Sequence, residues 1–233
     1  MSGMQEKTMQ IYSSVVSPFG LRVVLGAKAK GQDVAVLALP EGGVRSETFL
    51  RINPLGKIPV LVAGDGRHVA ESVAILAYLE HCFPSPALLP GDPAARACMD
   101  AACRAVDLYL MTPVCRLFRH LDPNQRDERL VGTEVEQWRI GARRLSALLA
   151  SAMLPVAAEW SMLDCVLAPS LHLSRRISAM LGLRADPATE EGLGASYVDY
   201  AAHPEIGPML RALTEAQESY DLKAGRPSVA GCH

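Results

Sequence analysis

The chain has 233 residues, of which 49% are apolar and 21% are charged, and its formal net charge at pH 7 is −2. This composition excludes an intrinsically disordered chain and the strongly basic face typical of proteins that bind nucleic acid or anionic membranes. The longest apolar stretch, residues 145–158, is interrupted by serine and proline and is shorter than the ~20 residues of a membrane span. Residues 1–8 hold no apolar run of the kind found in signal peptides. We therefore expect a soluble cytoplasmic protein with no nucleic-acid or membrane partner.

The first 82 residues alternate short strand and helix patterns. A β-type run meets Ser17 and Pro18, and from Pro18 apolar side chains recur at helical spacing until Gly31. Residues 46–52 are ambiguous, and residues 63–66 form a tight turn between two strands. The expected order is βαβ, then a hairpin, then a helix. The predicted strands cover residues 11–16, 33–39, 58–62 and 67–70, and the predicted helices cover residues 18–31 and 72–82.

A proline-rich segment divides the chain. Residues 83–93 hold four prolines and show no periodicity, which predicts a linker between a domain of residues 1–82 and one of residues 94–233. Every pattern beyond the linker is helical, and Pro113 is expected to kink the first helix. The last ten residues are expected to be a solvated tail. The predicted helices cover residues 94–121, 126–152, 161–181, 190–202 and 204–218.

The six cysteines show neither a Cys-x-x-Cys pair nor the spacing of metal ligands. We expect five of them to be small core residues in a reducing compartment. Two adjacent pairs of possible ligands, His81-Cys82 and Cys232-His233, lie far apart along the chain. We therefore predict no metal site.

Ser17 is the first residue that could carry chemistry. A serine directly before a proline at the first helical position is a common start signal, so capping alone would explain it. Its hydroxyl could also face a ligand at the positive end of a helix dipole, where an anion is stabilised. The residues themselves leave both interpretations open.

The run Asn53-Pro54-Leu55-Gly56-Lys57-Ile58-Pro59-Val60-Leu61 places a proline inside a predicted strand. A strand tolerates proline at its edge, and a tight turn tolerates it as a cis-proline. A cis bond would turn the Ile58 backbone outward, where its N–H and C=O could pair with an extended peptide. An ordinary edge proline would explain the residue without any ligand.

Two further serines stand before predicted helices. Ser72, preceded by Glu71, is expected to be an N-cap whose free amides could also bind a carboxylate. Ser161 and Asp164 form the Ser-x-x-Asp pattern of a capping box, with Trp160 and Cys165 placed as a hydrophobic staple. We interpret this second pattern as structural.

Together these features resemble the glutathione transferase superfamily over nearly the whole chain. The resemblance rests on Ser-Pro-Phe after the first strand, the run at residues 53–61, Glu-Ser-x-Ala-Ile-x-x-Tyr-Leu at residues 71–79, and the capping box. It implies a thioredoxin-like α/β domain followed by an all-α helical bundle. It also implies that glutathione, a cosubstrate, binds along the first domain as an extended tripeptide.

The resemblance assigns roles to particular residues. The Ile58 backbone before Pro59 would pair with the cysteinyl moiety, Glu71 and Ser72 would hold the γ-glutamyl end, and Lys57 would help to bind the peptide. Ser17 aligns with the activating residue, which is Ser in some classes and Cys in others. A Ser there favours conjugation, isomerisation or peroxide reduction by a glutathione thiolate, whereas a Cys would favour mixed-disulfide exchange. Tyr12 and Ser14 are the hydroxyls that could replace Ser17 if the register differed.

A small hydrophobic electrophile would bind between the domains against the first long helix. The candidates for that wall are Leu108, Tyr109, Met111 and Thr112, although these could equally be plain core residues. Low aromatic content predicts that aliphatic and Met side chains dominate this second pocket. The family also implies a homodimer.

The alternative is a regulator without transferase activity. Residues 83–93, 160–171 and 210–218 are similar to the stringent starvation protein A branch of the same superfamily, whose members bind RNA polymerase. In that interpretation Pro84, Ser85 and Pro86 would face the partner. The branch often carries His where this chain has Ser85.

Overall fold

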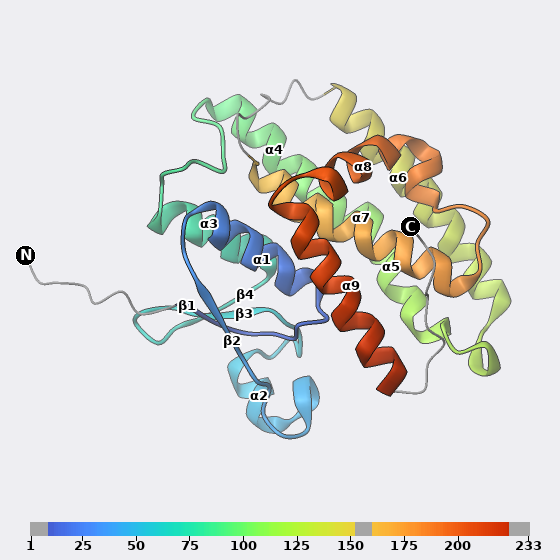
Figure 1. Ribbon diagram of the computed structural model, residues 1–233, viewed down its shortest axis with the longest axis horizontal. Helices are drawn as coiled ribbons and strands as arrows, with labels where there is room; N and C mark the ends of the chain where they lie inside the picture. The colour runs from blue at the N-terminus through green and yellow to red at the C-terminus, as the bar shows by residue number, and fades with distance from the viewer. Residues whose placement is uncertain (1–8, 152–159, 224–233) are drawn as a thin grey trace, which may run out of the picture.

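The structure is a computed structural model that describes residues 9–151 and 160–223 (Figure 1). The predicted solvated tail and Cys232 lie outside the described residues, as does the last residue of the helix predicted over residues 126–152. Within the described ranges, none of the helices is both long and apolar enough to cross a membrane. The same residues contain no group of three or more potential metal ligands.

A four-stranded mixed sheet with strand order β2-β1-β3-β4 organises the N-terminal half. Helices α1 and α3 lie between this sheet and the later helices, while α2 lies on the opposite side of the sheet (Figure 1). This arrangement confirms the predicted βαβ, hairpin and helix order of a thioredoxin-like domain. The strands are β1 (Met9–Tyr12), β2 (Val34–Leu37), β3 (Val60–Val62) and β4 (His68–Ala70), and the helices are α1 (Pro18–Ala29), α2 (Glu47–Ile52) and α3 (Ser72–Cys82).

The first strand differs from the prediction. It ends at Tyr12 rather than at residue 16, because the chain then turns and the Ser17 amide donates to the Ser14 carbonyl at 3.0 Å. Residues 13–17 are therefore a loop. The ambiguous residues 46–52 contain a short helix capped by Ser46, whose Oγ accepts from the Phe49 amide at 3.2 Å.

The C-terminal half is a bundle of helices, as predicted. Its elements are α4 (Pro93–Ala105), the π-helical η2 (Val106–Met111), α5 (Thr112–Leu117), α6 (Glu128–Ser151), α7 (Met162–Leu181), the π-helical η5 (Thr189–Leu193), α8 (Gly194–Ala202) and α9 (Ile206–Lys223). Short 3₁₀ turns are η1 (Gly43–Arg45), η3 (Phe118–His120) and η4 (Pro123–Gln125).

The first helix of the bundle is interrupted earlier than predicted. The break is the wide turn η2, which precedes Pro113, and Pro113 occupies the first turn of α5, where a missing N–H costs little. Gly141 of α6 approaches this turn so closely that a Cβ atom there would lie 1.9 Å from the Tyr109 carbonyl oxygen. The pattern predicted a helix here correctly but not its change of winding.

The predicted capping box of α7 is confirmed. Ser161 Oγ accepts from the Asp164 amide at 3.4 Å, and Asp164 Oδ2 accepts from the Ser161 amide at 2.6 Å. Trp160 stacks on His203 with ring centroids 5.5 Å apart, and both Trp160 and Cys165 belong to the main core. The box therefore fixes where the most buried helix of the molecule begins.

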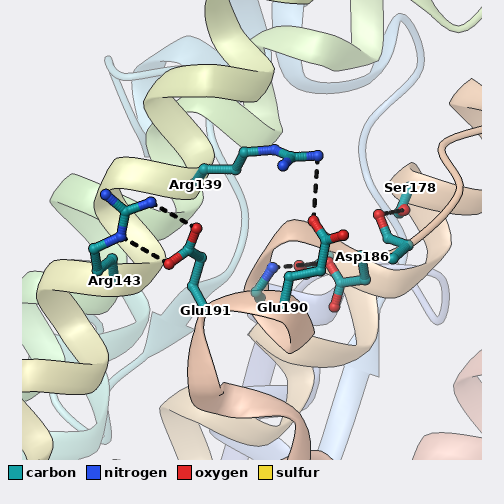
Figure 2. Close-up of polar contacts among 9 residues, drawn as sticks. Arg139, Arg143, Ser178, Asp186, Glu190 and Glu191 are labelled. Carbon is teal, nitrogen blue, oxygen red and sulfur yellow. Dashed lines mark hydrogen bonds and ion pairs between the residues drawn. The ribbon is translucent and has the colours of Figure 1, made fainter.

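Charged side chains tie α6 to the segment that precedes α8 (Figure 2). Arg143 donates two hydrogen bonds of 2.8 Å to Glu191, and Arg139 lies 3.2 Å from Glu190. Hydrogen bonding from Arg143 lowers the pKa of Glu191. Asp186 accepts from Ser174 at 2.7 Å, which links the same segment to α7.

The main hydrophobic core crosses the predicted domain boundary. It joins Leu25 of α1 and Leu76 of α3 to Leu88 and to the helices of the bundle. Glu80 fixes the intervening segment, since it pairs with the buried Lys30 and accepts from the Leu88 amide at 2.9 Å. The boundaries at residues 82 and 93 therefore stay predictions, because the two halves share one interior.

The expectation that five cysteines lie in the core is wrong. Cys103 and Cys165 are buried and Cys115 is half-buried, but Cys82 and Cys98 are exposed. Both exposed thiols lie on helix faces that the core does not cover.

Candidate functional site

The sheet register brings the candidate residues to one end of the sheet. Tyr12 lies opposite Val60, and Val60 lies opposite Ala70. Because β3 runs antiparallel to both neighbours, the residues that follow Tyr12, precede Val60 and follow Ala70 must leave the sheet at the same end. The loop that leads to Ser17, the Ile58-Pro59 pair and the Glu71-Ser72 pair meet there.

Ser17 is the N-cap of α1. Its Oγ accepts from the Gly20 amide at 3.1 Å, and Pro18 occupies the first helical position. The hydroxyl hydrogen has no acceptor among the residues the structure describes, so it remains available to a ligand. Because the helix dipole is positive at this end, an anion placed beside the hydroxyl would be stabilised.

The segment before β3 is held by a buried asparagine. Asn53 is 2% exposed, donates to the Lys57 carbonyl at 2.7 Å and accepts from the Leu55 amide at 3.1 Å. The Ile58–Pro59 peptide bond is cis, as one of the two sequence interpretations required. Lys57 is exposed, Ile58 is half-buried and Pro59 is buried. Asn53 therefore holds the Lys57-Ile58 backbone at the end of the sheet, just before β3.

Glu71, not Ser72, is the N-cap of α3, which corrects the prediction. Helical conformation begins at Ser72, and its buried hydroxyl accepts from Arg22 Nη1 at 3.2 Å instead of capping the helix. Glu71 is exposed and has φ 69°, the one positive φ of a non-glycine residue in the described chain. A conformation of this kind costs about 1–3 kcal/mol, and such outliers cluster at ligand-binding sites. Glu71 thus directly precedes the amides at the start of α3, and its side chain forms no capping hydrogen bond with them.

Arg22 joins these elements, although no sequence motif marked it as a site residue. It is 1% exposed, and besides Ser72 it donates to Asp107 of η2 at 2.7 Å and to Ser170 of α7 at 2.7 Å. Its guanidinium also lies 4.6 Å from the centre of the Phe19 ring. The buried guanidinium of Arg22 therefore connects α1 and the start of α3 to η2 and α7 of the helical half.

A signal for Arg22 was present in the sequence. Arg22 lies four residues after Pro18 and three before Leu25, on the apolar face of α1. A charged residue on a buried helix face requires a partner, because an unpaired buried charge is very costly. The partners come from residues 72, 107 and 170, which no local pattern connects.

The two hydroxyls that could have replaced Ser17 are used elsewhere. The Tyr12 ring packs edge-on against Phe49 of α2, with centroids 6.1 Å apart, and so faces the side of the sheet away from α1. Ser14 Oγ accepts from the Val16 amide at 3.4 Å within the loop. Neither occupies a helix start, which leaves Ser17 as the hydroxyl at the positive end of α1.

The assignment of Leu108, Tyr109, Met111 and Thr112 to a second-substrate pocket stays a prediction. Leu108, Tyr109 and Thr112 line a cavity of about 160 Å³ whose other walls come from α5 and α6. The cavity therefore lies within the helical half and not between the two halves. Met111 is 2% exposed and belongs to the core, so the plain core interpretation holds for that residue. The cavity is also less apolar than expected, since its remaining lining residues include Arg116, Glu134, Gln137 and Arg144.

Cysteines of the chain itself are poor nucleophiles near this site. Burial raises the pKa of Cys103 to about 12, and burial likewise raises the pKa of Cys115, with the charges of Arg22 and Lys57 opposing it. The thiolate is the reactive form, so these sulfurs stay protonated and inert at neutral pH. Neither Cys103 nor Cys115 is therefore suited to supply a thiolate at this site.

Known proteins are similar to this chain in sequence and in fold. Residues 16–82 match the family described as the glutathione S-transferase N-terminal domain. A glutathione S-transferase 1 of Dianthus caryophyllus is 41% identical over 99 residues, which cover 42% of this chain and 44% of that protein. A probable maleylacetoacetate isomerase 1 of Drosophila melanogaster is 30% identical over 171 residues, covering 69% and 66%.

The whole described fold also has solved counterparts. Rice GST1, solved in complex with glutathione, superposes with a TM-score of 0.73 at 25% identity, covering 95% of this chain and 100% of that one. By sequence, the match to the Dianthus protein spans less than half of that relative's length. The family match over residues 16–82 includes Ser17, Ile58, Pro59, Glu71 and Ser72.

Proposed function

Since the chain belongs to the glutathione S-transferase superfamily, we propose that it binds glutathione at the sheet end and activates its thiol. The observation that carries the proposal is the position of Ser17, a helix N-cap whose hydroxyl hydrogen can donate to an anion. A free thiol has a pKa of about 8.5, so stabilising the thiolate increases the reactive fraction at neutral pH.

The tripeptide would lie at the end of the sheet, along the Ser17 loop, the Ile58-Pro59 pair and the Glu71-Ser72 pair. The Ile58 amide and carbonyl pair with the cysteinyl residue in the manner of an added strand, and Lys57 approaches a carboxylate of the peptide. Glu71 accepts from the γ-glutamyl ammonium group. The amides at the start of α3, with the Ser72 hydroxyl held by Arg22, receive the γ-glutamyl carboxylate.

The chemical step follows from this placement. The Ser17 hydroxyl donates to the sulfur anion, which attacks a small hydrophobic electrophile and forms a carbon–sulfur bond. In conjugation a leaving group departs or a proton is taken up, and in isomerisation the thiolate adds to carbon and is later expelled. In peroxide reduction the thiolate instead attacks a peroxide oxygen: the O–O bond breaks, the alcohol leaves, and a second glutathione converts the resulting sulfenic acid into the disulfide and water. Leu108, Tyr109 and Thr112 remain the candidate wall for the electrophile.

Two measurements test the proposal. Titration calorimetry of the wild-type protein with reduced glutathione should show binding, and a reactive aryl halide should be conjugated at pH 6.5. Ser17→Ala should bind glutathione within about threefold of wild type but lower the conjugation rate by about 100-fold, the usual cost of removing one donor from a developing or bound anion. Ser14→Ala is the matched control and should keep its rate. Absence of glutathione binding, or an unchanged rate in Ser17→Ala, would contradict the proposal.

A homodimer and a cytoplasmic location are part of the same proposal, and sedimentation of the purified chain tests the first. The regulator hypothesis stays a prediction. Its support in the structure is that Pro84, Ser85 and Pro86 are all exposed and could meet a partner. It predicts that RNA polymerase is retained by the immobilised chain, and retention should be lost when Pro84 and Pro86 are both replaced by Ala.

A further inference from the structure

The loop that carries Ser17 is held from a distant part of the chain. Gln217 of α9 donates from Nε2 to the Val16 carbonyl at 3.1 Å, across 201 residues of sequence. Val16 directly precedes Ser17. The position of Ser17 relative to the sheet end is therefore coupled to the last described helix.

Apart from the Gln217 contact, the hydrogen bonds of residues 14–17 in the described structure span at most four residues. The Ser17 amide donates to the Ser14 carbonyl and the Val16 amide donates to Ser14 Oγ, while the amides of Gly20 and Leu21 donate to the hydroxyl and carbonyl of Ser17 at the start of α1. The Val15 side chain is 70% exposed, so its packing contributes little. A loop with local bonds alone opens more readily than one tied to a buried element.

Gln217 is itself rigidly placed. It is 5% exposed, and one turn further along α9 the buried Asp221 forms an ion pair with Arg176 of α7. His172 lies one turn before Arg176 on α7 and is also buried. The Arg176–Asp221 ion pair thus joins the two helices one turn beyond Gln217 and His172.

The buried His172 of α7 lies near the Gln217 side chain. Gln217 Oε1 and His172 Nε2 are both buried without a hydrogen-bond partner among the described residues. Burial lowers the pKa of His172 to about 4, with Gln217 opposing the effect and Arg176 and Arg175 adding to it. The hydrogen-bond partner of the Gln217 amide nitrogen is therefore the Val16 carbonyl.

We infer that Gln217 is a positioning residue that holds the Val16 carbonyl and thereby directs the Ser17 hydroxyl. The inference rests on the proposed function for its effect on catalysis, but the holding contact itself does not. Through Gln217, α9 thus contributes to the pKa of the thiol of bound glutathione, because it positions Ser17. No residue of α9 touches the reacting atoms in this scheme.

Hydrogen exchange tests the holding contact without requiring activity. In the full chain, Gln217→Met keeps the length of the side chain but removes its donor, and amides of residues 13–20 should exchange at least about fivefold faster than in wild type, since one buried hydrogen bond is lost. Glu215→Met, exposed on the same helix, is the matched control and should leave these amides unchanged. Gln217→Asn keeps the amide but is one methylene shorter, so it should act in the same direction. Unchanged exchange in both Gln217 variants would overturn the inference.

The pH dependence of conjugation tests the positioning role. In Gln217→Met the midpoint of kcat/KM against pH should rise by at least about 0.5 unit, because a displaced Ser17 stabilises the thiolate less well. KM for glutathione should stay within about twofold, since Lys57, Ile58 and Glu71 are untouched. Faster exchange with an unchanged midpoint would overturn the role of Gln217 in positioning Ser17. If the wild type shows no glutathione turnover, the proposed function fails, and hydrogen exchange alone then decides whether Gln217 holds the loop.

Discussion

At the sheet end, the groups offered to a ligand come mainly from the backbone: the amides that begin α1 and α3, and the amide and carbonyl of Ile58. In the cavity beside Tyr109, the lining consists of side chains from three helices. Backbone groups are positioned by capping and strand register, which short motifs specify. Side-chain linings depend on how helices pack, which no motif in the cavity specifies. The contrast explains why the sequence carries motifs for the sheet end but none for the cavity beside Tyr109.

The largest expected effect tests the cation that joins the two regions. Arg22→Met should lower the free energy of unfolding by about 3 kcal/mol, because Asp107 loses its buried partner and Ser72 and Ser170 lose their donor. It should also weaken glutathione binding, since Ser72 is no longer held. Urea denaturation and calorimetry measure both quantities.

The control for Arg22 lies on the same helix. Lys28→Met removes an exposed side chain that lies 3.5 Å from the exposed Glu205, and it should change stability by less than about 0.5 kcal/mol. If Arg22→Met were equally harmless, the two halves would not depend on this cation.

A smaller effect should be confined to the helical region. Gly141→Ala forces a Cβ against the Tyr109 carbonyl, which should destabilise the chain by about 2 kcal/mol as α6 and η2 move apart. Glutathione binding should stay at the wild-type level, because the sheet end is not involved. Gly132→Ala, in open space on the same helix, is the control and should stabilise by up to about 1 kcal/mol. Weakened glutathione binding in Gly141→Ala would show that the two regions are less independent than we argue.

The smallest effect should separate stability from function at the sheet end. Glu71→Gly removes the strain of a positive φ and should raise the free energy of unfolding by about 1 kcal/mol relative to Glu71→Ala. Both variants lose the carboxylate and should bind glutathione about tenfold more weakly, the cost of one hydrogen bond to a charged group. Equal stability of the two variants in thermal unfolding would argue against strain at this position.

Local signals predicted much of the fold. The caps at Ser17 and Ser161 and the helix of residues 72–82 were predicted correctly, because each depends on hydrogen bonds within a few residues. The strand predicted over residues 11–16 extended too far toward the C-terminus. β-type residues continue to Val16, whereas the partner strand β2 ends at Leu37, opposite Tyr12. The sequence alone also could not distinguish Ser72 from Glu71 as the cap of α3, because the Ser72 hydroxyl is bound by Arg22, which is distant in the sequence.

By itself, the sequence determined most of the helices and strands, the caps of α1 and α7, and which motifs are candidates for binding a peptide ligand. Only the tertiary structure decided that Arg22 joins both halves, that the cavity beside Tyr109 lies inside the bundle, and that Gln217 reaches the loop of Ser17. The physical reason is the range of the interactions. Caps and periodicity act over three or four residues, whereas buried charges, close helix contacts and long-range hydrogen bonds pair residues that only the completed packing brings together.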